Sequence, residues 1–147
     1  MSIFNLFRGK DKSREAGYPK ELMTDVYWAF YGGTYSSEKD FVQAVDKYHT
    51  ELERKAEWRP GEVALQSKEV IILYSYWDEN EDDEVEADFS LVADKNFFTA
   101  GELLFKIHNK VVENLQDDDH HFFEGLTLYT ENGHETHIPG YALMQGS

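Results

Sequence analysis

The chain has 147 residues, a formal net charge of −15 and no cysteine, and 41% of its residues are hydrophobic. A single domain of this size buries enough surface to fold without disulfides, and the lack of cysteine excludes disulfides, thiolate metal sites and cysteine nucleophiles. No run of residues approaches the ~20 apolar residues of a membrane-spanning helix and no signal peptide is evident, so we expect a cytoplasmic protein without membrane insertion.

The negative charge is confined to one part of the chain. Residues 1–60 contain 10 basic and 10 acidic residues, whereas residues 61–147 contain 4 basic and 19 acidic ones. A field of this sign repels nucleic acid and attracts basic proteins. Two interpretations stay open: a charged surface that keeps the protein dissolved, and a docking surface for a basic partner.

The first 20 residues differ in composition from the rest. Residues 1–20 contain five basic and two acidic residues, with apolar side chains near their start. Such a segment can touch a membrane surface, but Ser2 stands where N-myristoylation requires glycine. We predict a basic N-terminal tail over residues 1–20, mobile or docked on the domain, and a single acidic α+β domain over residues 21–147.

The first half of the domain is predicted to contain a strand, a helix and two further strands. Large apolar side chains alternate over residues 25–31, which favours a strand, although a helix starting near Pro19 also fits the spacing. Ser37 and Asp40 form a capping-box pattern that begins a helix reaching to about residue 56. Two strands follow, over residues 62–66 and 70–77.

The second half is predicted to repeat this order of elements. An acidic loop over residues 78–84 leads to a strand at 85–92, whose alternating pattern predicts one solvated face. Thr99 and Glu102 form a second capping box before a helix. The chain then forms a hairpin, with strands over residues 122–130 and 141–144 and a turn centred on Asn132 and Gly133.

Together these elements predict an α+β fold, with a mainly antiparallel sheet and two amphipathic helices packed on one face. The order strand-helix-strand-strand occurs twice, and the two first strands begin at residues 25 and 85. This spacing suggests a pseudo-duplicated βαββ unit, without residue identity between the halves.

Two acidic segments are the most unusual features of the sequence. The first, residues 78–84, begins like an EF-hand calcium loop but lacks the glycine and the glutamate that such a loop needs at its sixth and twelfth positions. The second is residues 117–119, three aspartates at the end of the second predicted helix, where carboxylates oppose the helix dipole. Local rules broken without visible compensation indicate where function should be sought.

Histidines and a lone carboxylate offer other candidate sites. His120 and His121 could bind a transition metal with the three aspartates, but adjacent residues of an extended chain point to opposite faces, and we predict no metal or cofactor. His108 borders the apolar stripe of the second helix, where we expect a hydrogen-bonded core histidine. Glu124 could stand at the mouth of a pocket, but no nucleophile motif or glycine-rich nucleotide-binding motif accompanies it.

The leading interpretation is a non-enzymatic module that binds a basic protein. In size and charge the chain resembles the small acidic immunity proteins that bacteria make against basic toxins, which implies inhibition by electrostatic and steric occlusion. The aromatic residues in predicted strands include two that we assign to the interface with the partner. The predicted partner-binding residues are Asp78, Glu79, Glu81, Asp82, Asp83, Glu84, Asp117, Asp118, Asp119, Trp77 and Tyr129.

Two alternatives come from other functional classes. A duplicated βαββ unit resembles the effector-binding domains of bacterial multidrug regulators, which implies a sensor that holds a cationic, aromatic ligand against a carboxylate in an aromatic cleft. The third candidate is an enzyme, which would show a cleft where at least two titratable groups converge.

Overall fold

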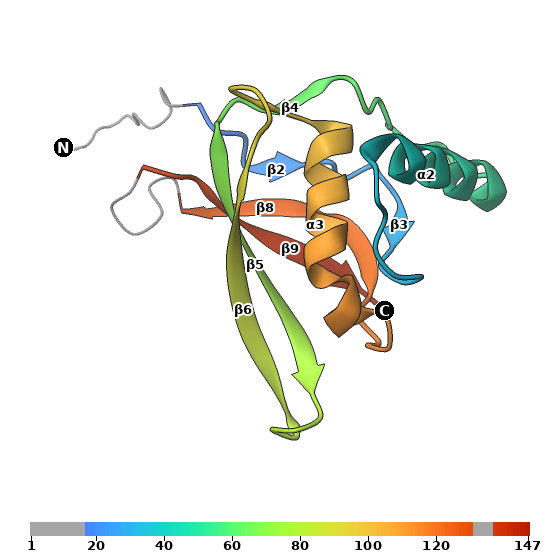
Figure 1. Cartoon of the computed structure of the whole chain (residues 1–147), viewed down its shortest axis with the longest axis vertical. Helices are drawn as coiled ribbons and strands as arrows, with labels where there is room; N and C mark the ends of the chain where they lie inside the picture. Colours follow the sequence, from blue (N-terminus) through green and yellow to red (C-terminus); the bar gives the residue numbers. More distant parts are fainter. Residues whose placement is uncertain (1–16, 131–136) are drawn as a thin grey trace.

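We describe residues 17–130 and 137–147 of a computed structural model of the chain (Figure 1). The elements follow in the order β2 (Glu21–Leu22), β3 (Trp28–Ala29), α2 (Glu38–Leu52), β4 (Val63–Leu65), β5 (Glu69–Asp78), β6 (Asp83–Val92), β7 (Phe98–Thr99), α3 (Ala100–Leu115), β8 (Phe122–Thr130) and β9 (Gly140–Gly146). The predicted turn at Asn132 and Gly133 and the first 16 residues of the predicted tail lie outside the described residues. The predicted α+β fold, with a mainly antiparallel sheet and two helices, is confirmed.

The larger of the two sheets has six strands. Five of them lie in the order β2-β8-β9-β5-β6, and β3 pairs with β8 beside this path. The described pairings are antiparallel apart from that of β5 with β9. Strands β4 and β7 form a separate two-stranded sheet. The duplicated βαββ unit stays a prediction. In such a duplication β4 and β8 would be counterparts, but β4 lies outside the larger sheet and β8 lies within it.

Strand β8 changes partner at a bulge. Phe123 pairs with Trp28 of β3, whereas Leu126 pairs with Leu22 of β2. Between them Gly125 has a φ of +113°, a conformation that glycine adopts far more readily than other residues. A Cβ atom at Gly125 would lie 3.1 Å from the carbonyl oxygen of Leu22. Glycine therefore lets β8 pass close to β2 and pair with both short strands.

The first predicted strand is shorter than the sequence pattern suggests. Of residues 25–31, only Trp28–Ala29 form a strand. The segment does not simply alternate between buried and exposed positions, because Trp28, Ala29 and Phe30 are all buried in succession. The N–H of Phe30 instead donates to the carbonyl oxygen of His121 at 2.8 Å, just before the start of β8.

Helix α2 begins where the sequence predicts and ends earlier. The Ser37 hydroxyl accepts a hydrogen bond from the Asp40 N–H at 3.1 Å. The predicted end near residue 56 is wrong, because Glu53 adopts a left-handed conformation, with φ 55°, and its N–H donates to the carbonyl oxygen of Thr50. This geometry is a known way of ending a helix, although glycine is the usual residue there.

Helix α3 contains only half of its predicted capping box. The Thr99 hydroxyl accepts from the Glu102 N–H at 3.2 Å. The carboxylate of Glu102, which is only 5% exposed, instead accepts from the Asp94 N–H at 2.7 Å and from Lys106 Nζ at 2.8 Å. Burial alone lowers the pKa of Lys106, but its hydrogen bonds with Glu102 and Asp94 outweigh that effect and raise it. The buried carboxylate is thus fully used in holding the loop before α3.

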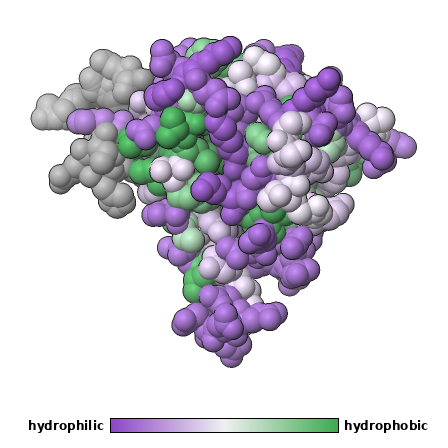
Figure 2. Space-filling model, in the orientation of Figure 1, coloured by the Kyte–Doolittle hydropathy of each residue, from purple (hydrophilic) through white to green (hydrophobic). Residues whose placement is uncertain are grey.

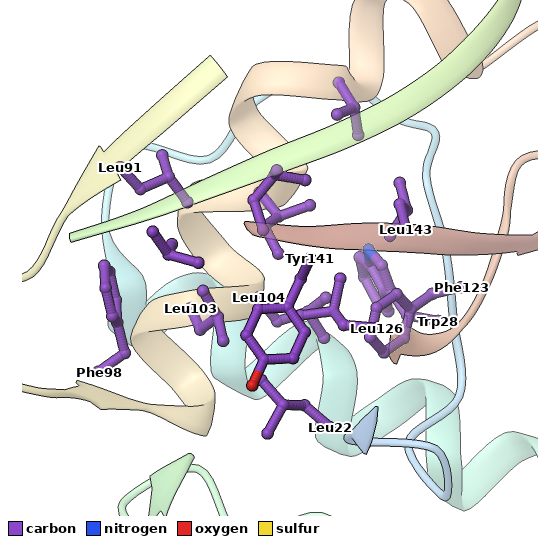
Figure 3. Packing of buried hydrophobic residues seen from close by; sticks show 14 of the residues in the cluster. Leu22, Trp28, Leu91, Phe98, Leu103, Leu104, Phe123, Leu126, Tyr141 and Leu143 are labelled. Carbon is purple, nitrogen blue, oxygen red and sulfur yellow. The ribbon is translucent and has the colours of Figure 1, made fainter. Parts of the chain in front are cut away.

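The core lies between α3 and the larger sheet. Helix α3 packs against β5, and α2 packs against α3 and β3. In Figure 3 the fully buried ring of Tyr141 lies close to Leu104 of α3 and Leu22 of β2, and its hydroxyl donates to the carbonyl oxygen of Pro19 at 2.6 Å. Each large apolar side chain buried here contributes about 1.5–3 kcal/mol to stability.

Strands β5 and β6 form a hairpin that projects beyond the rest of the sheet (Figure 1). Along β6 the side chains of Glu86 and Asp88 are exposed and those between them are half-buried, which confirms the predicted solvated face. The predicted loop over residues 78–84 is too long: Asp78 pairs with Asp83, so only residues 79–82 form the turn. The ladder continues in unbroken register to the tip, and it outweighs the repulsion between the two facing carboxylates.

Candidate functional site

The loop after α3 is organised by Asp118. One oxygen of its carboxylate, Oδ1, accepts from the His120 N–H at 2.8 Å, and the other, Oδ2, accepts from the Trp77 N–H at the end of β5, also at 2.8 Å. The Asp118 N–H donates to the carbonyl oxygen of Leu115 at 3.0 Å. Charge-assisted hydrogen bonds of this kind are stronger than neutral ones. Asp118 therefore ties the end of α3 to β5, which offsets its unfavourable position in the helix dipole.

Gln145 of β9 also forms hydrogen bonds with both β5 and the loop after α3. Its side-chain amide accepts from the Ser75 N–H at 3.0 Å and donates to the Ser75 carbonyl oxygen at 2.9 Å, so it extends the pairing of β5 beyond the end of the backbone ladder with β9. The same amide donates to the carbonyl oxygen of His120 at 3.0 Å. The end of β5 and the loop after α3 are thus fixed to each other by two side chains, Asp118 of the loop itself and Gln145 of β9.

Trp77 stands where these elements meet. Trp77 is 52% exposed, whereas tryptophan is highly buried on average. A depression of about 330 Å³ lies on one side of it, lined by Trp77, Glu84, Asp117, Asp118, Asp119 and His120. A second depression, of about 360 Å³, is lined by Tyr76, Trp77, Asp78, Glu79, Asn80, Glu113, Asn114, Asp117 and Asp118. We call the residues that line these two depressions the Trp77 surface.

The Trp77 surface is strongly acidic. Seven of its side chains are carboxylates, and none of the described residues that line it is lysine or arginine. Figure 2 shows hydrophilic side chains gathered at the lower end of the molecule, around the tip of the β5–β6 hairpin. Seven carboxylates around one exposed indole ring offer a cationic group both ion pairs and an aromatic face.

The structure brings together most of the predicted partner-binding residues, although their two segments are far apart in the sequence. The members that line the Trp77 surface are Trp77, Asp78, Glu79, Glu84, Asp117, Asp118 and Asp119. Glu81 and Asp82 lie in the hairpin turn, and Asp83 opens β6, and none of the three lines either depression. Tyr129 of β8 does not line them either; burial raises its pKa and the nearby Asp88 raises it further.

Glu113 also lines the second depression and was not among the residues predicted from the sequence. Glu113 lies four residues before Asp117, a spacing at which two side chains share a face as long as a helix continues, although α3 itself ends at Leu115. That spacing could have added Glu113 to the acidic segment. Tyr76 and Asn80 flank residues that were assigned and had no distinguishing signal of their own.

A separate cavity lies beside the start of β8. Its volume is about 480 Å³, and its lining residues are Thr24, Val26, Tyr27, Trp28, Tyr48, Leu52, Arg54, Phe122, Phe123, Glu124 and Ser147. Glu124 is exposed at this cavity, in the position that the sequence analysis suggested. Arg54 lies 4.4 Å from the centre of the Tyr27 ring. The guanidinium therefore occupies one aromatic face that a cationic ligand would need.

His108 is a core residue with both ring nitrogens bonded. Nδ1 accepts from Trp28 Nε1 at 3.0 Å, and Nε2 donates to the carbonyl oxygen of Gly33 at 2.7 Å. Burial lowers its pKa, although the hydrogen bond to Gly33 partly opposes this shift. This arrangement requires the neutral ring with its proton on Nε2, which confirms the expectation of a hydrogen-bonded core histidine.

Within residues 17–130 and 137–147, no three or more histidine, aspartate or glutamate side chains are grouped so that they could hold a metal ion. His121 Nδ1 lies 2.6 Å from the carbonyl oxygen of Asp118, which uses one ring nitrogen locally. Over the same described ranges, neither helix is long and apolar enough to cross a lipid bilayer. Comparison with protein-family models, curated proteins and solved structures finds no match to this chain.

Proposed function

We propose that this protein is a non-enzymatic interaction module that binds a basic protein through the Trp77 surface. The observation that carries the proposal is the meeting of two acidic segments at Trp77, fixed by the hydrogen bond from the Trp77 N–H to Asp118. Because cysteine is lacking, a reducing, cytoplasmic compartment suits the chain. The particular form we favour is an immunity-type inhibitor that covers the basic face of its target.

The energetics of the surface support a charged partner. Asp78 faces Asp83 across the hairpin, and like charges directly opposite in a sheet destabilise it. Asp117 and Asp119 lie near the carboxyl end of α3, where each anion costs about 0.3–1 kcal/mol. Cationic side chains from a partner would relieve both penalties at once, so part of the binding free energy is stored as repulsion in the free protein.

Charge and the tryptophan would have different effects on binding kinetics. The acidic field accelerates encounter with a basic protein and makes the association rate fall with salt. Trp77 would be covered at the centre of the interface, where tryptophan side chains commonly contribute 2 kcal/mol or more. An interface of standard size would bury about 800 Å² on this protein. We expect the charges to set the association rate and Trp77 to set the dissociation rate.

A charge-matched pair of variants tests the proposal. The first combines Glu79→Gln, Glu113→Gln and Asp117→Asn on the Trp77 surface. The control combines Asp25→Asn, Asp46→Asn and Glu51→Gln, which also removes three exposed carboxylates but away from that surface. Each protein is immobilised and exposed to native cell lysate at low salt and at about 0.5 M salt, where the Debye length is only a few Å.

The proposal predicts that the wild type and the control retain the same basic protein at low salt and release it at high salt. The Trp77-surface variant should bind that protein at least tenfold more weakly, mainly through a slower association rate measured with purified components. Equal loss in both variants would mean that net charge alone governs the interaction, and the assignment of the Trp77 surface would then be wrong.

The aromatic cavity beside β8 favours a second candidate function, the binding of a small ligand. Five of its lining residues are aromatic, and Glu124 supplies a carboxylate. Because Trp28 lines this cavity, a bound aromatic ligand should change its fluorescence. A titration with an aromatic quaternary ammonium compound tests this function: saturable quenching that Glu124→Gln weakens would support a sensor, and no change up to millimolar concentration would reject it for this ligand class.

A further inference from the structure

Strand β6 is an unusually regular edge. It is the last strand in the order of the larger sheet, and its ten residues pair with β5 in continuous register. Its sequence contains no lysine, proline or glycine. Natural proteins commonly protect long edge strands with lysine, proline or a bulge, because an open edge pairs with other chains. Lysine, proline and a bulge are all absent from β6, whose edge bears carboxylates instead, so the outer edge is competent to accept a strand of opposite charge.

The direction of the backbone groups on this edge follows from two hydrogen bonds beyond the ladder. The Ala93 N–H donates to the carbonyl oxygen of Lys68 on the β5 side at 2.8 Å, whereas the Val92 carbonyl oxygen accepts from Lys106 Nζ at 2.9 Å. Successive residues of a strand direct their N–H and C=O groups to opposite edges. The residues whose backbone groups point away from β5 are therefore Glu84, Glu86, Asp88 and Ser90.

Among the described residues, no strand pairs with this outer edge. Because Lys106 occupies the carbonyl oxygen of Val92, the accessible stretch runs from Glu84 to Ser90, about 23 Å at the usual rise of a strand, and within it the Glu84 N–H already donates to Asp83 Oδ1 at 2.8 Å. Its outward-directed residues bear three exposed carboxylates. Val85, Ala87 and Phe89 alternate with them and are half-buried on the other face, where Ala87 and Phe89 pack against the core.

We propose that the basic partner contributes an extended segment that pairs as an added strand along the outer edge of β6. Lysine or arginine side chains at every second position would lie beside Glu84, Glu86 and Asp88. The intervening apolar side chains would cover the half-buried face. This inference deepens the proposed function and rests on it, since Glu84 belongs both to this edge and to the Trp77 surface and lies directly opposite Trp77.

Charge decides between this occupant and a second copy of the chain. Antiparallel pairing of β6 with its counterpart in another molecule would bring the carboxylates of Glu84, Glu86 and Asp88 against the same set. Like charges on paired strands are destabilising, whereas opposite charges stabilise the pair. Strand addition takes its affinity from main-chain hydrogen bonds and its specificity from alternate side chains. The edge thus selects a basic strand and rejects itself.

Amide hydrogen exchange measured by NMR on the whole chain tests this proposal. The probe is an acetylated, amidated nine-residue peptide in which lysine alternates with valine. In the free protein the outward amides of Glu86, Asp88 and Ser90 should exchange quickly; the Glu84 amide already donates to Asp83 Oδ1 and is not a probe. On saturation with the peptide at least two of them should slow tenfold or more, whereas the amides already bonded to β5 should change little. The alternation itself is the signature of strand addition.

Variants at Ser90 isolate the backbone contribution from charge. Ser90→Pro removes an outward N–H without changing the charge or the bonds to β5, and Ser90→Ala is its matched control. We expect the peptide to bind Ser90→Pro at least fivefold more weakly than Ser90→Ala. If Ser90→Pro does not fold, Glu86→Pro and Glu86→Gln repeat the comparison. Methylation of alternate backbone nitrogens in the peptide gives the same test with the wild-type protein.

Three results would overturn the inference. Outward amides that are already protected in the free protein would mean that another part of this chain or a second copy occupies the edge. If the peptide binds but slows the exchange of no outward amide, its lysines contact only the carboxylate side chains and no strand is added. Failure of the peptide to bind, while the triple variant of the Trp77 surface still loses the lysate partner, would reject strand addition and leave the proposed function intact.

Discussion

Two tryptophans of this protein occupy opposite surroundings. Trp28 is 6% exposed, packs edge-on against Phe41 with ring centres 5.1 Å apart, and donates from Nε1 to His108. Trp77 is 52% exposed and is surrounded by carboxylates at the junction of a hairpin and a helix end. Each tryptophan also has a histidine nearby: His108 is buried beside Trp28, and His120 is exposed beside Trp77.

The difference separates residues that serve the fold from residues available to a partner. Around Trp28 the indole N–H and both ring nitrogens of His108 have hydrogen-bond partners within the protein. Around Trp77 the backbone is held by hydrogen bonds to the side chains of Asp118 and Gln145, whereas the carboxylates of the Trp77 surface remain close together. Rigid support under an unsatisfied surface is what a preformed binding site requires, because little ordering free energy is then lost on association.

Substitution of the two tryptophans should give the largest contrast. Trp28→Ala removes a buried ring and leaves the Nδ1 atom of His108 without its donor, so we expect the free energy of unfolding to fall by about 3–5 kcal/mol. Trp77→Ala should change it by less than about 1 kcal/mol, because half of the side chain is already in water. Urea denaturation measured by circular dichroism checks both values.

Binding of the basic partner should show the reverse order. Trp77→Ala should raise the dissociation constant by about 30-fold or more, the equivalent of about 2 kcal/mol at an interface centre. Trp77→Phe, which keeps an aromatic ring, is the matched control and should recover part of the affinity. A stable Trp77→Ala protein that binds its partner normally would break the comparison and remove Trp77 from the interface.

Much of the fold could be predicted because local chemistry marks it. The capping residues Ser37 and Thr99 place both helix starts, and the alternating pattern gives β6 its solvated face. The earlier end of α2 could not be predicted, because a left-handed Glu53 has no sequence signal comparable to glycine. The two short strands β2 and β7 were also missed, since two residues are too few to show any periodicity.

The candidate site was predictable in composition and not in arrangement. Two acidic segments could be selected from the sequence, but their meeting at Trp77 depends on where α3 ends relative to β5. Two contacts from side chains fix that relation, those of Asp118 and Gln145, and neither follows from periodicity. The three aspartates looked like a violated rule, and the structure divides them: Asp118 has a structural partner, whereas Asp117 and Asp119 are exposed.

The pH dependence of stability should give a further contrast between the regions around Trp28 and Trp77, because a histidine lies in each. Burial lowers the pKa of His108 below the ordinary value of about 6.5. The unfolded chain therefore binds a proton first as the pH falls. The stability that the neutral ring provides is complete above about pH 6.5 and is lost as the pH drops towards the lowered pKa, by up to about 1.4 kcal/mol per pH unit. His49, whose pKa burial also lowers, acts in the same direction.

Unfolding in urea at pH 7.5 and pH 5.5 measures this effect. His108→Gln can keep both hydrogen bonds with an amide that does not titrate, so the difference in stability between the two pH values should shrink. His120→Gln, which replaces an exposed histidine outside the core, is the matched control. An undiminished difference in His108→Gln would show that other groups dominate the pH dependence.

The smallest and most discriminating effects are expected within the aspartate segment. Asp118→Ala removes the acceptor of the Trp77 and His120 N–H groups, so stability should fall by about 1 kcal/mol. Asp117→Asn removes a charge that opposes the helix dipole, so stability should rise by a few tenths of a kcal/mol while association with the basic partner slows. Chemical denaturation and stopped-flow association measure the two quantities separately. If Asp117→Asn lowered stability without slowing association, the segment would serve the fold alone, and the surface around Trp77 would lose its distinction from the core around Trp28.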